Sequence, residues 1–308
     1  RIPDRSGLPA LKNYAHLQLA SGERRIVGYT EASRGCRHMC RHCPVVQVYG
    51  GAFRVVQPEI VLADIRRQVA AGAEHITFGD PDFFNGPGHA LAVVKALHRE
   101  FPALTYDVTI KIEHLLKFSS RLPVLLDTGC AFVTSAAESL DDPVLALLEK
   151  GHTRSDFFRA VELMQAAGLP LAPTFIPFTP WTTLAGYQDL LRQSADAGLV
   201  ENVSPVQFAI RLLIPQRSRL LELPEVRARI DGFDGEMLSY RWRNPDPTVD
   251  ELQAQVEQDV AAAGREGLSR SEAYSRIWNL ACEASAASAM PELPARATIP
   301  FLTEPWYC

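Results

Sequence analysis

Residues 35–44 read Gly35-Cys36-Arg37-His38-Met39-Cys40-Arg41-His42-Cys43-Pro44. Three cysteines with the spacing C-x3-C-x2-C are thus crowded together, while Cys130, Cys282 and Cys308 lie far apart in the chain. This distribution is typical of a metal site in a reducing compartment rather than of a disulfide framework. Because a glycine and a proline frame the three cysteines, we expect them on a loop rather than on one helical face.

The cysteine spacing fits an iron–sulfur site with one open position. Three thiolates, from Cys36, Cys40 and Cys43, can each bind one iron of a 4Fe–4S cubane and leave the fourth iron without a protein ligand. An open iron can chelate the amino and carboxylate groups of S-adenosylmethionine (SAM). The alternative is a structural zinc site in which His38 or His42 is the fourth ligand. Such zinc sites usually pair ligands across two knuckles, and the sequence has no second knuckle.

Outside this loop, short β-rich runs alternate with longer helical patterns, which predicts six βα units with parallel strands. The strand candidates are Arg25–Ala32, Glu74–Phe78, Leu104–Ile112, Cys130–Ser135, Leu171–Pro177 and Val203–Leu213. The helix candidates are Pro58–Ala71, His89–Glu100, His114–Ser119, Pro143–Lys150, Ser155–Ala167 and Thr183–Ala197. Pro58 suits a first helical turn, and Gly168 suits a helix stop.

The alternation stops after about Pro215. Two helical patterns follow, Thr248–Ala263 and Ser269–Ala287, and the proline-rich stretch Pro291–Cys308 has no clear periodicity. A chain of 308 residues accommodates one α/β barrel and an extension. We therefore predict a barrel over residues 1–215, and a C-terminal extension and tail over 216–308.

Composition and charge narrow the function classes. The chain is 47% hydrophobic and 22% charged, which is ordinary for a globular protein with a sizeable core. Its net charge of -5 gives no overall basic footprint, so we do not expect a nucleic-acid partner. No apolar run approaches the roughly 20 residues that span a bilayer, and the first residues do not resemble a signal peptide. The expectation is a cytoplasmic protein with no membrane partner.

The cysteine loop, placed directly after the first predicted strand, resembles the signature of the radical SAM superfamily. The resemblance implies a partial (β/α)6 TIM-like barrel, here with an α-helical C-terminal extension. It also implies a 4Fe–4S cluster and SAM as cofactors, a small-molecule substrate in the barrel mouth, and an external electron donor such as flavodoxin or ferredoxin. In this superfamily the residue before the third cysteine is often aromatic and lies beside the adenine of SAM, and here it is His42.

Two later segments extend the resemblance. Residues 77–85 resemble the loop that receives the SAM amino group, which implies cofactor-binding roles for Gly79, Asp80 and Asp82; the alternative is an acidic turn. Residues 134–139 and 147–153 resemble the superfamily's "ESG…L…KGHT" stretch, which places Ser135 and Glu138 near the methionine or ribose of SAM. Glu138 has an alternative role as a carboxylate at a helix start.

Three further sites are also candidates. Residues 175–183 resemble the superfamily's "G-x-P-x-E-T" turn, with Phe178 in place of glycine and Thr182 in place of glutamate. Lys111 and Glu113 follow the third predicted strand and can point into the same mouth or be charges on its rim. Arg211 lies in an apolar strand candidate, where an unpaired arginine is costly, so we expect it to meet a carboxylate, either that of SAM or that of the substrate.

The closing residues resemble the approach to a Cys-Cys-Ala-Glu-Pro tail, or its selenocysteine counterpart, that ends one radical SAM group. The diagnostic pair is absent, because only Cys308 is present. If the tail folds over the barrel mouth, the Cys308 thiolate can act on a substrate, an auxiliary metal or a thiophilic metalloid. The alternative is a terminal cysteine with no specific role.

The predicted reaction is one-electron cleavage of SAM to a 5'-deoxyadenosyl radical, which then abstracts hydrogen from the substrate. An alternative within the same class is cleavage toward a 3-amino-3-carboxypropyl group and its transfer to a thiophilic atom. An alternative of another class is a zinc or iron–sulfur binding module without catalytic activity. The barrel type does not identify the substrate, because such barrels host many chemistries.

Overall fold

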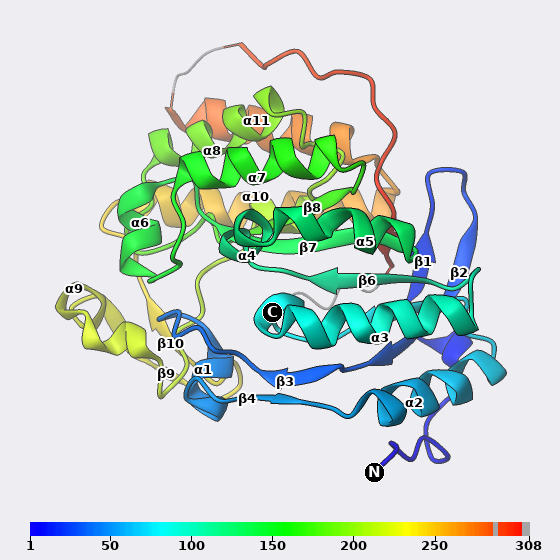
Figure 1. Cartoon of the computed structure of the whole chain (residues 1–308). Coiled ribbons are helices and arrows are strands. Elements are labelled where there is room, and N and C mark those ends of the chain that lie inside the picture. The colour runs from blue at the N-terminus through cyan, green and yellow to red at the C-terminus, as the bar shows by residue number, and fades with distance from the viewer. Residues whose placement is uncertain (286–288, 304–308) are drawn as a thin grey trace.

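The computed structural model describes residues 1–285 and 289–303. Its centre is a curled sheet of seven strands in the order β11-β1-β2-β5-β6-β7-β8, in which β2 and β5 to β8 are parallel. The strands are β1 (His16–Gln18), β2 (Arg24–Thr30), β5 (His75–Phe78), β6 (Thr105–Thr109), β7 (Cys130–Glu138), β8 (Leu171–Phe175) and β11 (Phe301–Leu302). A curled, mostly parallel sheet with helices on its outer face is a partial barrel, which confirms the predicted fold class (Figure 1).

Helices follow each of the five parallel strands, as the alternation of patterns predicts. They are α1 (Pro44–Tyr49), α2 (Pro58–Ala70), α3 (Pro87–Glu100), α4 (Ile112–Lys117), α5 (Leu122–Asp127), α6 (Asp142–Leu147), α7 (Arg154–Ala166) and α8 (Leu184–Asp196). Pro58 stands at the first turn of α2, and Gly168 adopts φ +69° just after α7, which are the start and stop roles expected of them. A short hairpin of β3 (Ser33–Gly35) and β4 (Phe53–Val55) flanks α1.

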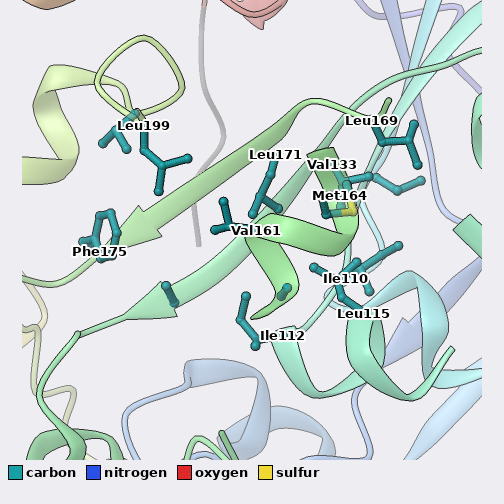
Figure 2. Close-up of a cluster of buried hydrophobic side chains, with 14 of the residues drawn as sticks. Ile110, Ile112, Leu115, Val133, Val161, Met164, Leu169, Leu171, Phe175 and Leu199 are labelled. Atoms are coloured by element: carbon teal, nitrogen blue, oxygen red, sulfur yellow. The ribbon is translucent and has the colours of Figure 1, made fainter. Parts of the chain in front are cut away.

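The main core lies between the sheet and this outer layer of helices. Figure 2 shows one part of it, where Val133 and Leu171 of neighbouring strands meet Val161 and Met164 of α7. All four side chains are at most 5% exposed. Each such side chain contributes about 1.5–3 kcal/mol when it is fully buried, so this layer holds the helices against the sheet.

The sixth predicted strand, Val203–Leu213, does not form as a strand. The segment contains a 3-10 helix, η4 (Pro205–Phe208), and its strand-like pairing within the described residues is limited to an isolated parallel bridge between Phe178 and Arg211. Pro205 has no N–H to donate to a ladder, and the 3-10 turn consumes the residues that would continue one. The barrel is therefore partial, with five full parallel strands and a remnant of the sixth.

Two short strands that the sequence patterns do not predict extend the other edge of the sheet. β1 pairs antiparallel with β2, and β11 pairs antiparallel with β1, so β11 runs in the same direction as β2. Leu17 and Leu302 of these strands share a buried cluster with Val27 of β2 and Phe132 of β7. Because β2 and β7 are not neighbours in the sheet, these side chains meet across its concave face. The final described segment thus packs into the interior of the partial barrel.

The chain beyond residue 215 adds helices and a hairpin. They are α9 (Pro224–Arg227), β9 (Ile230–Asp234), β10 (Ser239–Trp242), α10 (Pro247–Glu266) and α11 (Arg270–Ser285). The two long helices pack on each other, and α11 packs on α8 (Figure 1). Within the described residues, no helix has the length and apolar character needed to cross a membrane.

Candidate active site

The three clustered cysteines lie on an irregular loop at the carboxyl end of β2, as expected. Gly35 begins the loop at φ +77°, where an added Cβ would stand 2.2 Å from the Ala52 carbonyl oxygen, so only glycine fits. Cys43 caps α1, and its N–H donates to the Cys40 carbonyl at 3.2 Å. The Arg41 N–H donates to the Leu148 carbonyl at 2.9 Å, which ties the loop to the end of α6.

The thiols are sheltered and influence one another. Cys40 is buried, and Cys36 and Cys43 are partly buried. Burial, helped by the neighbouring Cys40 and Cys36 thiols, raises the pKa of Cys43 to about 11. Burial also raises the pKa of Cys36, although the Asn85 side chain opposes this shift. Three thiolates so placed repel one another unless a cation lies between them, so this donor set fits an iron–sulfur cluster.

Glu138 ends β7 beside this loop. It adopts φ +65°, which is uncommon for a residue with a side chain, and its Oε1 lies 3.0 Å from His42 Nε2 and 3.2 Å from Lys150 Nζ. Burial alone would raise the pKa of Glu138, but the charge of Lys150 and the bond from His42 outweigh it and lower the pKa to about 2. Glu138 is therefore an ionised carboxylate, and His42 Nδ1 is buried without a hydrogen-bond partner in the described part of the chain.

Asp82 is the second buried carboxylate of the mouth. Its Oδ2 lies 2.6 Å from His114 Nδ1 and 3.5 Å from His38 Nε2. Burial raises the pKa of Asp82, but the close approach of His114 and His38 outweighs burial and lowers the pKa to about 2. The Oδ1 atom accepts from Phe84 N at 3.2 Å, so Asp82 also caps the turn after β5.

Gly79 and Asp80 belong to the same turn after β5 and fix how it packs against β2 and the cysteine loop. An added Cβ at Gly79 would stand 1.8 Å from the Tyr29 hydroxyl oxygen, so glycine lets the backbone pass under this ring. Asp80 accepts from Ala32 N at 2.8 Å and from the Ser33 hydroxyl. Burial raises the pKa of Asp80 to about 7, in spite of these bonds. Both Asp80 oxygens thus hold the backbone that enters the cysteine loop.

Other predicted site residues have partners within the chain. Ser135 Oγ donates to the Ile110 carbonyl at 2.6 Å. Arg211 Nη1 lies 2.7 Å from Asp250 Oδ1, and its guanidinium stacks on the Trp242 ring at 3.6 Å. Arg211 therefore meets a carboxylate, as expected, but that carboxylate belongs to α10. Thr182, in place of glutamate, closes its own turn by donating to the Pro177 carbonyl at 2.7 Å.

Lys111, Glu113 and Cys308 were also predicted to lie at the mouth. Lys111 Nζ lies 3.4 Å from Glu113 Oε2. His152 lies close to both Lys111 and Lys150, because burial and the charges of these two lysines lower the pKa of His152 to about 4. The Lys111–Glu113 pair thus lies near the Lys150–Glu138 pair. Cys308 lies outside the described residues.

Sequence patterns assign no role to His114 and place Lys150 in the KGHT-like stretch without a role of its own, and these two residues pair with the two buried carboxylates of the mouth. His114 follows the third strand, and Lys150 stands in the segment after the fourth. Their position past a strand end was the available signal, but charged residues also occur there on solvated rims.

The zinc alternative has a counterpart in the structure. Cys36, His38 and Asp82 each bring one ligand atom to within 4.8 Å of the others. Cys40 and Cys43 do not belong to this group, so a zinc ion there would leave two of the three clustered cysteines unused. The cluster reading uses all three.

Comparison with known proteins agrees with this geometry. A family model described as "Radical SAM superfamily" matches residues 30–192, which is more than half of the chain and includes the cysteine loop and β3 to β8. A hopanoid C-3 methylase of Methylococcus capsulatus is 25% identical over 151 residues, which cover 49% of this chain and 29% of that protein. A tRNA-2-methylthio-N(6)-dimethylallyladenosine synthase of Geobacter sulfurreducens is 25% identical over 158 residues, 47% of this chain and 34% of that protein.

Solved structures share the fold at low identity. The cobalamin-dependent SAM radical enzyme OxsB, with aqua-cobalamin and SAM bound, matches 76% of this chain and 41% of its own with a TM-score of 0.64 and 16% identity. The radical SAM methyltransferase TsrM from Kitasatospora setae matches 77% of this chain and 52% of its own, with a TM-score of 0.53 and 16% identity. The chain thus spans about a third of the curated relatives' length. By the match over residues 30–192, this chain belongs to the radical SAM superfamily, whose members use a 4Fe–4S cluster and S-adenosylmethionine.

Proposed function

We propose that this chain cleaves SAM reductively at a 4Fe–4S cluster held by Cys36, Cys40 and Cys43, and so starts a radical reaction on a small molecule in the barrel mouth. The observation that carries the proposal is the loop that shelters three cysteines together at the end of β2. When bound and reduced, the cluster supplies the electron that breaks a carbon–sulfur bond of SAM.

The buried carboxylates supply the contacts that SAM needs. Asp82 and Glu138 are ionised, and both border the cysteine loop through His38 and His42. An ionised carboxylate suits the SAM ammonium or a ribose hydroxyl. His42, with one ring nitrogen bound to Glu138 and the other unpartnered, suits the adenine edge. Gly79 lets the Tyr29 ring lie directly against the backbone of the turn.

Other predicted residues act through their neighbours in this proposal. Asp80 is a positioning residue, because its oxygens hold Ala32 and Ser33 at the entry of the cysteine loop. Ser135 joins β7 to the carboxyl end of β6 by donating to the Ile110 carbonyl. We leave Arg211 out of the SAM site because Asp250 and Trp242 already bind its guanidinium.

Cys308 is proposed as a thiol that serves the reaction in the mouth, and the direction of β11 supports this role. The Thr303 N–H donates to the His16 carbonyl, and His16 pairs with Ile26, so Thr303 lies level with Ile26 of β2. The carboxyl end of β2, at Thr30, is four residues or roughly 13 Å farther along the same direction. Five residues reach at most about 17 Å, so Cys308 is within reach of the mouth.

Anaerobic reconstitution with iron and sulfide, followed by mass spectrometry of SAM products under strong reductant, tests the proposal. The proposal predicts 5'-deoxyadenosine. Methylthioadenosine would instead indicate 3-amino-3-carboxypropyl transfer, which keeps the cluster but changes the reaction. Tightly bound zinc with no SAM cleavage would replace the proposal with a binding module.

A further inference from the structure

Asp107 of β6 carries its carboxylate on the concave face of the sheet. Tyr106 and Val108, its neighbours in the strand, lie in the core between the sheet and the outer helices. Side chains of a strand alternate between its two faces, so Asp107 faces the interior of the partial barrel. Asp107 pairs in register with Thr77 of β5, and β5 ends one residue later at Phe78. Asp107 therefore lies one residue, or roughly 3 Å, deeper in the barrel than the carboxyl end of β5.

One oxygen of Asp107 is bound by side chains of the neighbouring strand. Asp107 Oδ1 accepts from the Thr77 hydroxyl at 2.6 Å and lies 2.9 Å from His75 Nε2. His75 is fully buried, its Nδ1 lies 2.8 Å from the Thr105 hydroxyl oxygen, and its ring stacks on Phe132 of β7. The position of the Asp107 carboxylate is therefore fixed before any ligand arrives.

The other oxygen of Asp107 is left without a donor. Asp107 is only 5% exposed, yet its Oδ2 accepts no hydrogen bond from any described residue. Native proteins seldom leave a buried acceptor unsatisfied, and such an atom calls for a bound molecule or water. Because a carboxylate oxygen only accepts, the group that completes Oδ2 is a donor.

The charge of Asp107 also has no permanent cation beside it. Among the described residues its ion-pair partner is His75 alone, and a histidine is charged only when it is protonated. Lys111, the cation that follows β6, is paired with Glu113. A ligand that brings a positive charge to Oδ2 therefore supplies what the chain itself does not.

Two hydroxyl groups continue the same face toward the mouth. Thr109 comes two residues after Asp107 in β6, so its side chain points the same way, and it pairs with Thr134 of β7. Both side chains are partly exposed, and neither hydroxyl bonds to a residue in the part of the chain that the structure describes. Hydroxyls both donate and accept, so these threonines suit polar groups of a ligand that extends from Asp107 toward the strand ends.

We propose that Asp107 binds an amino group of the substrate, so that the small molecule in the barrel is a polar amine held by its ammonium. The inference rests on the proposed function, because it names the class of substrate for that reaction. An ammonium supplies both the donor that Oδ2 needs and the charge that complements the carboxylate. An amine seated there directs the rest of the molecule past Thr109 and Thr134 to the strand ends, where the cysteine loop begins. Asp107 is thus a specificity-determining residue that takes no part in bond breaking.

Three polyols that differ at one end test this site. Glucamine, sorbitol and gluconate carry an ammonium, a hydroxyl and a carboxylate there. Each is titrated by calorimetry into reconstituted, oxidised protein saturated with SAM, so that the cofactor site is filled and no cleavage occurs. We expect glucamine to bind about 10-fold or more tightly than sorbitol, because sorbitol lacks the charge-assisted hydrogen bond to Asp107. Gluconate should bind no more tightly than sorbitol, because its carboxylate meets that of Asp107.

Asp107→Asn should reduce the advantage of glucamine over sorbitol to within about 2-fold. Asparagine keeps an oxygen for Thr77 and His75, but its amide nitrogen replaces Oδ2 and repels an ammonium. Asp64→Asn is the matched control, since Asp64 is a carboxylate on α2 that is 1% exposed and has both oxygens bound by Arg5. This control should keep the full preference for glucamine. An equal loss in the two variants, or an unchanged preference in Asp107→Asn, would overturn the inference.

The wild type alone also decides the matter. Glucamine that binds no better than sorbitol, tighter binding of gluconate, or binding of none of the three overturns the inference without any variant. So does glucamine that binds only when SAM is absent, because it then occupies the cofactor site.

The two proposals fail in different ways. If wild-type protein cleaves no SAM even with dithionite, the proposed function is wrong. If dithionite supports cleavage but glucamine has no advantage over sorbitol, only the amine site is wrong.

Discussion

Glu138 Oε1 lies 3.0 Å from His42 Nε2, so the end of β7 is bonded to the residue that precedes Cys43. The same oxygen lies 3.2 Å from Lys150 Nζ, and all three side chains are largely withdrawn from solvent. A strand end, the cysteine loop and the segment after α6 therefore share one buried ionic contact. The orientation of the Glu138 carboxylate beside the cysteine loop is therefore set by contacts within the chain.

Glu138→Gln should destabilise the protein, because it leaves the Lys150 ammonium buried without its anion. Breaking a buried pair from one side costs about 3–5 kcal/mol, measurable as a lower denaturant midpoint. Glu149→Gln is the control, since Glu149 forms a more exposed pair with Arg41 and Arg219 and should cost about 1 kcal/mol or less. Adding Lys150→Met to Glu138→Gln should restore part of the loss. Equal losses in the two single variants would contradict the buried pair.

Asp80 should make stability depend on pH. Its pKa is raised to about 7 in the folded protein, against 3.8 ordinarily, so the folded state holds the proton more tightly than the unfolded state. This contribution is complete below pH 3.8 and is lost as pH rises through about 7. In the wild type, the free energy of unfolding should therefore decline between about pH 4 and about pH 8, by at most on the order of 4 kcal/mol. Asp80→Asn should remove this part of the decline. Parallel curves for wild type and variant, measured by urea unfolding, would show that Asp80 titrates normally.

The direction of β11 predicts that Cys308 can meet the cysteine loop. In cluster-free protein, mild oxidation with diamide should give a disulfide between Cys308 and Cys36, Cys40 or Cys43, identified by peptide mass spectrometry. Cys282 on α11 is the comparison thiol and should form no such bond. In reconstituted protein, Cys308→Ser should leave SAM cleavage by dithionite unchanged while impairing turnover of a substrate. Loop disulfides to Cys282 in place of Cys308 would remove the tail from the site.

The parallel strands were predictable because each is a short apolar run that can be recognised from its local sequence. Glu74–Phe78 and Leu171–Pro177, for example, coincide with β5 and β8 to within a few residues. The antiparallel edge was not predictable, because β1 and β11 are very short and pair across nearly the whole chain. Periodicity contains no information about such distant pairing. The prediction of a sixth strand was wrong because its apolar run is interrupted by a 3-10 turn at Pro205.

The candidate site shows the same division. The sequence alone locates Cys36, Cys40 and Cys43 on one loop, because their spacing is local. It also selects Asp80 and Arg211 as charged residues near the ends of predicted strands, but it does not predict the direction of their side chains. Asp80 turns toward Ser33, and Arg211 turns toward Asp250, because those partners arrive from other elements. Side-chain direction at strand ends depends on tertiary contacts that motif spacing does not encode.

Cys40→Ala should abolish the absorbance of the reconstituted cluster together with SAM cleavage, because two thiolates do not hold a cubane with one open iron. Cys130→Ala is the control. Cys130 is buried in β7 with its thiol near the Phe132 carbonyl, away from the loop, and its loss should leave iron content and cleavage intact. Retained cleavage in Cys40→Ala would refute the ligand role.

The most direct measurement is electron paramagnetic resonance of the reduced, reconstituted protein with and without SAM. A 4Fe–4S cluster bound by Cys36, Cys40 and Cys43 alone has an iron free to bind SAM, so addition of SAM should change the spectrum. A spectrum that SAM leaves unchanged, or a protein that retains zinc and shows no cluster signal, would contradict the account.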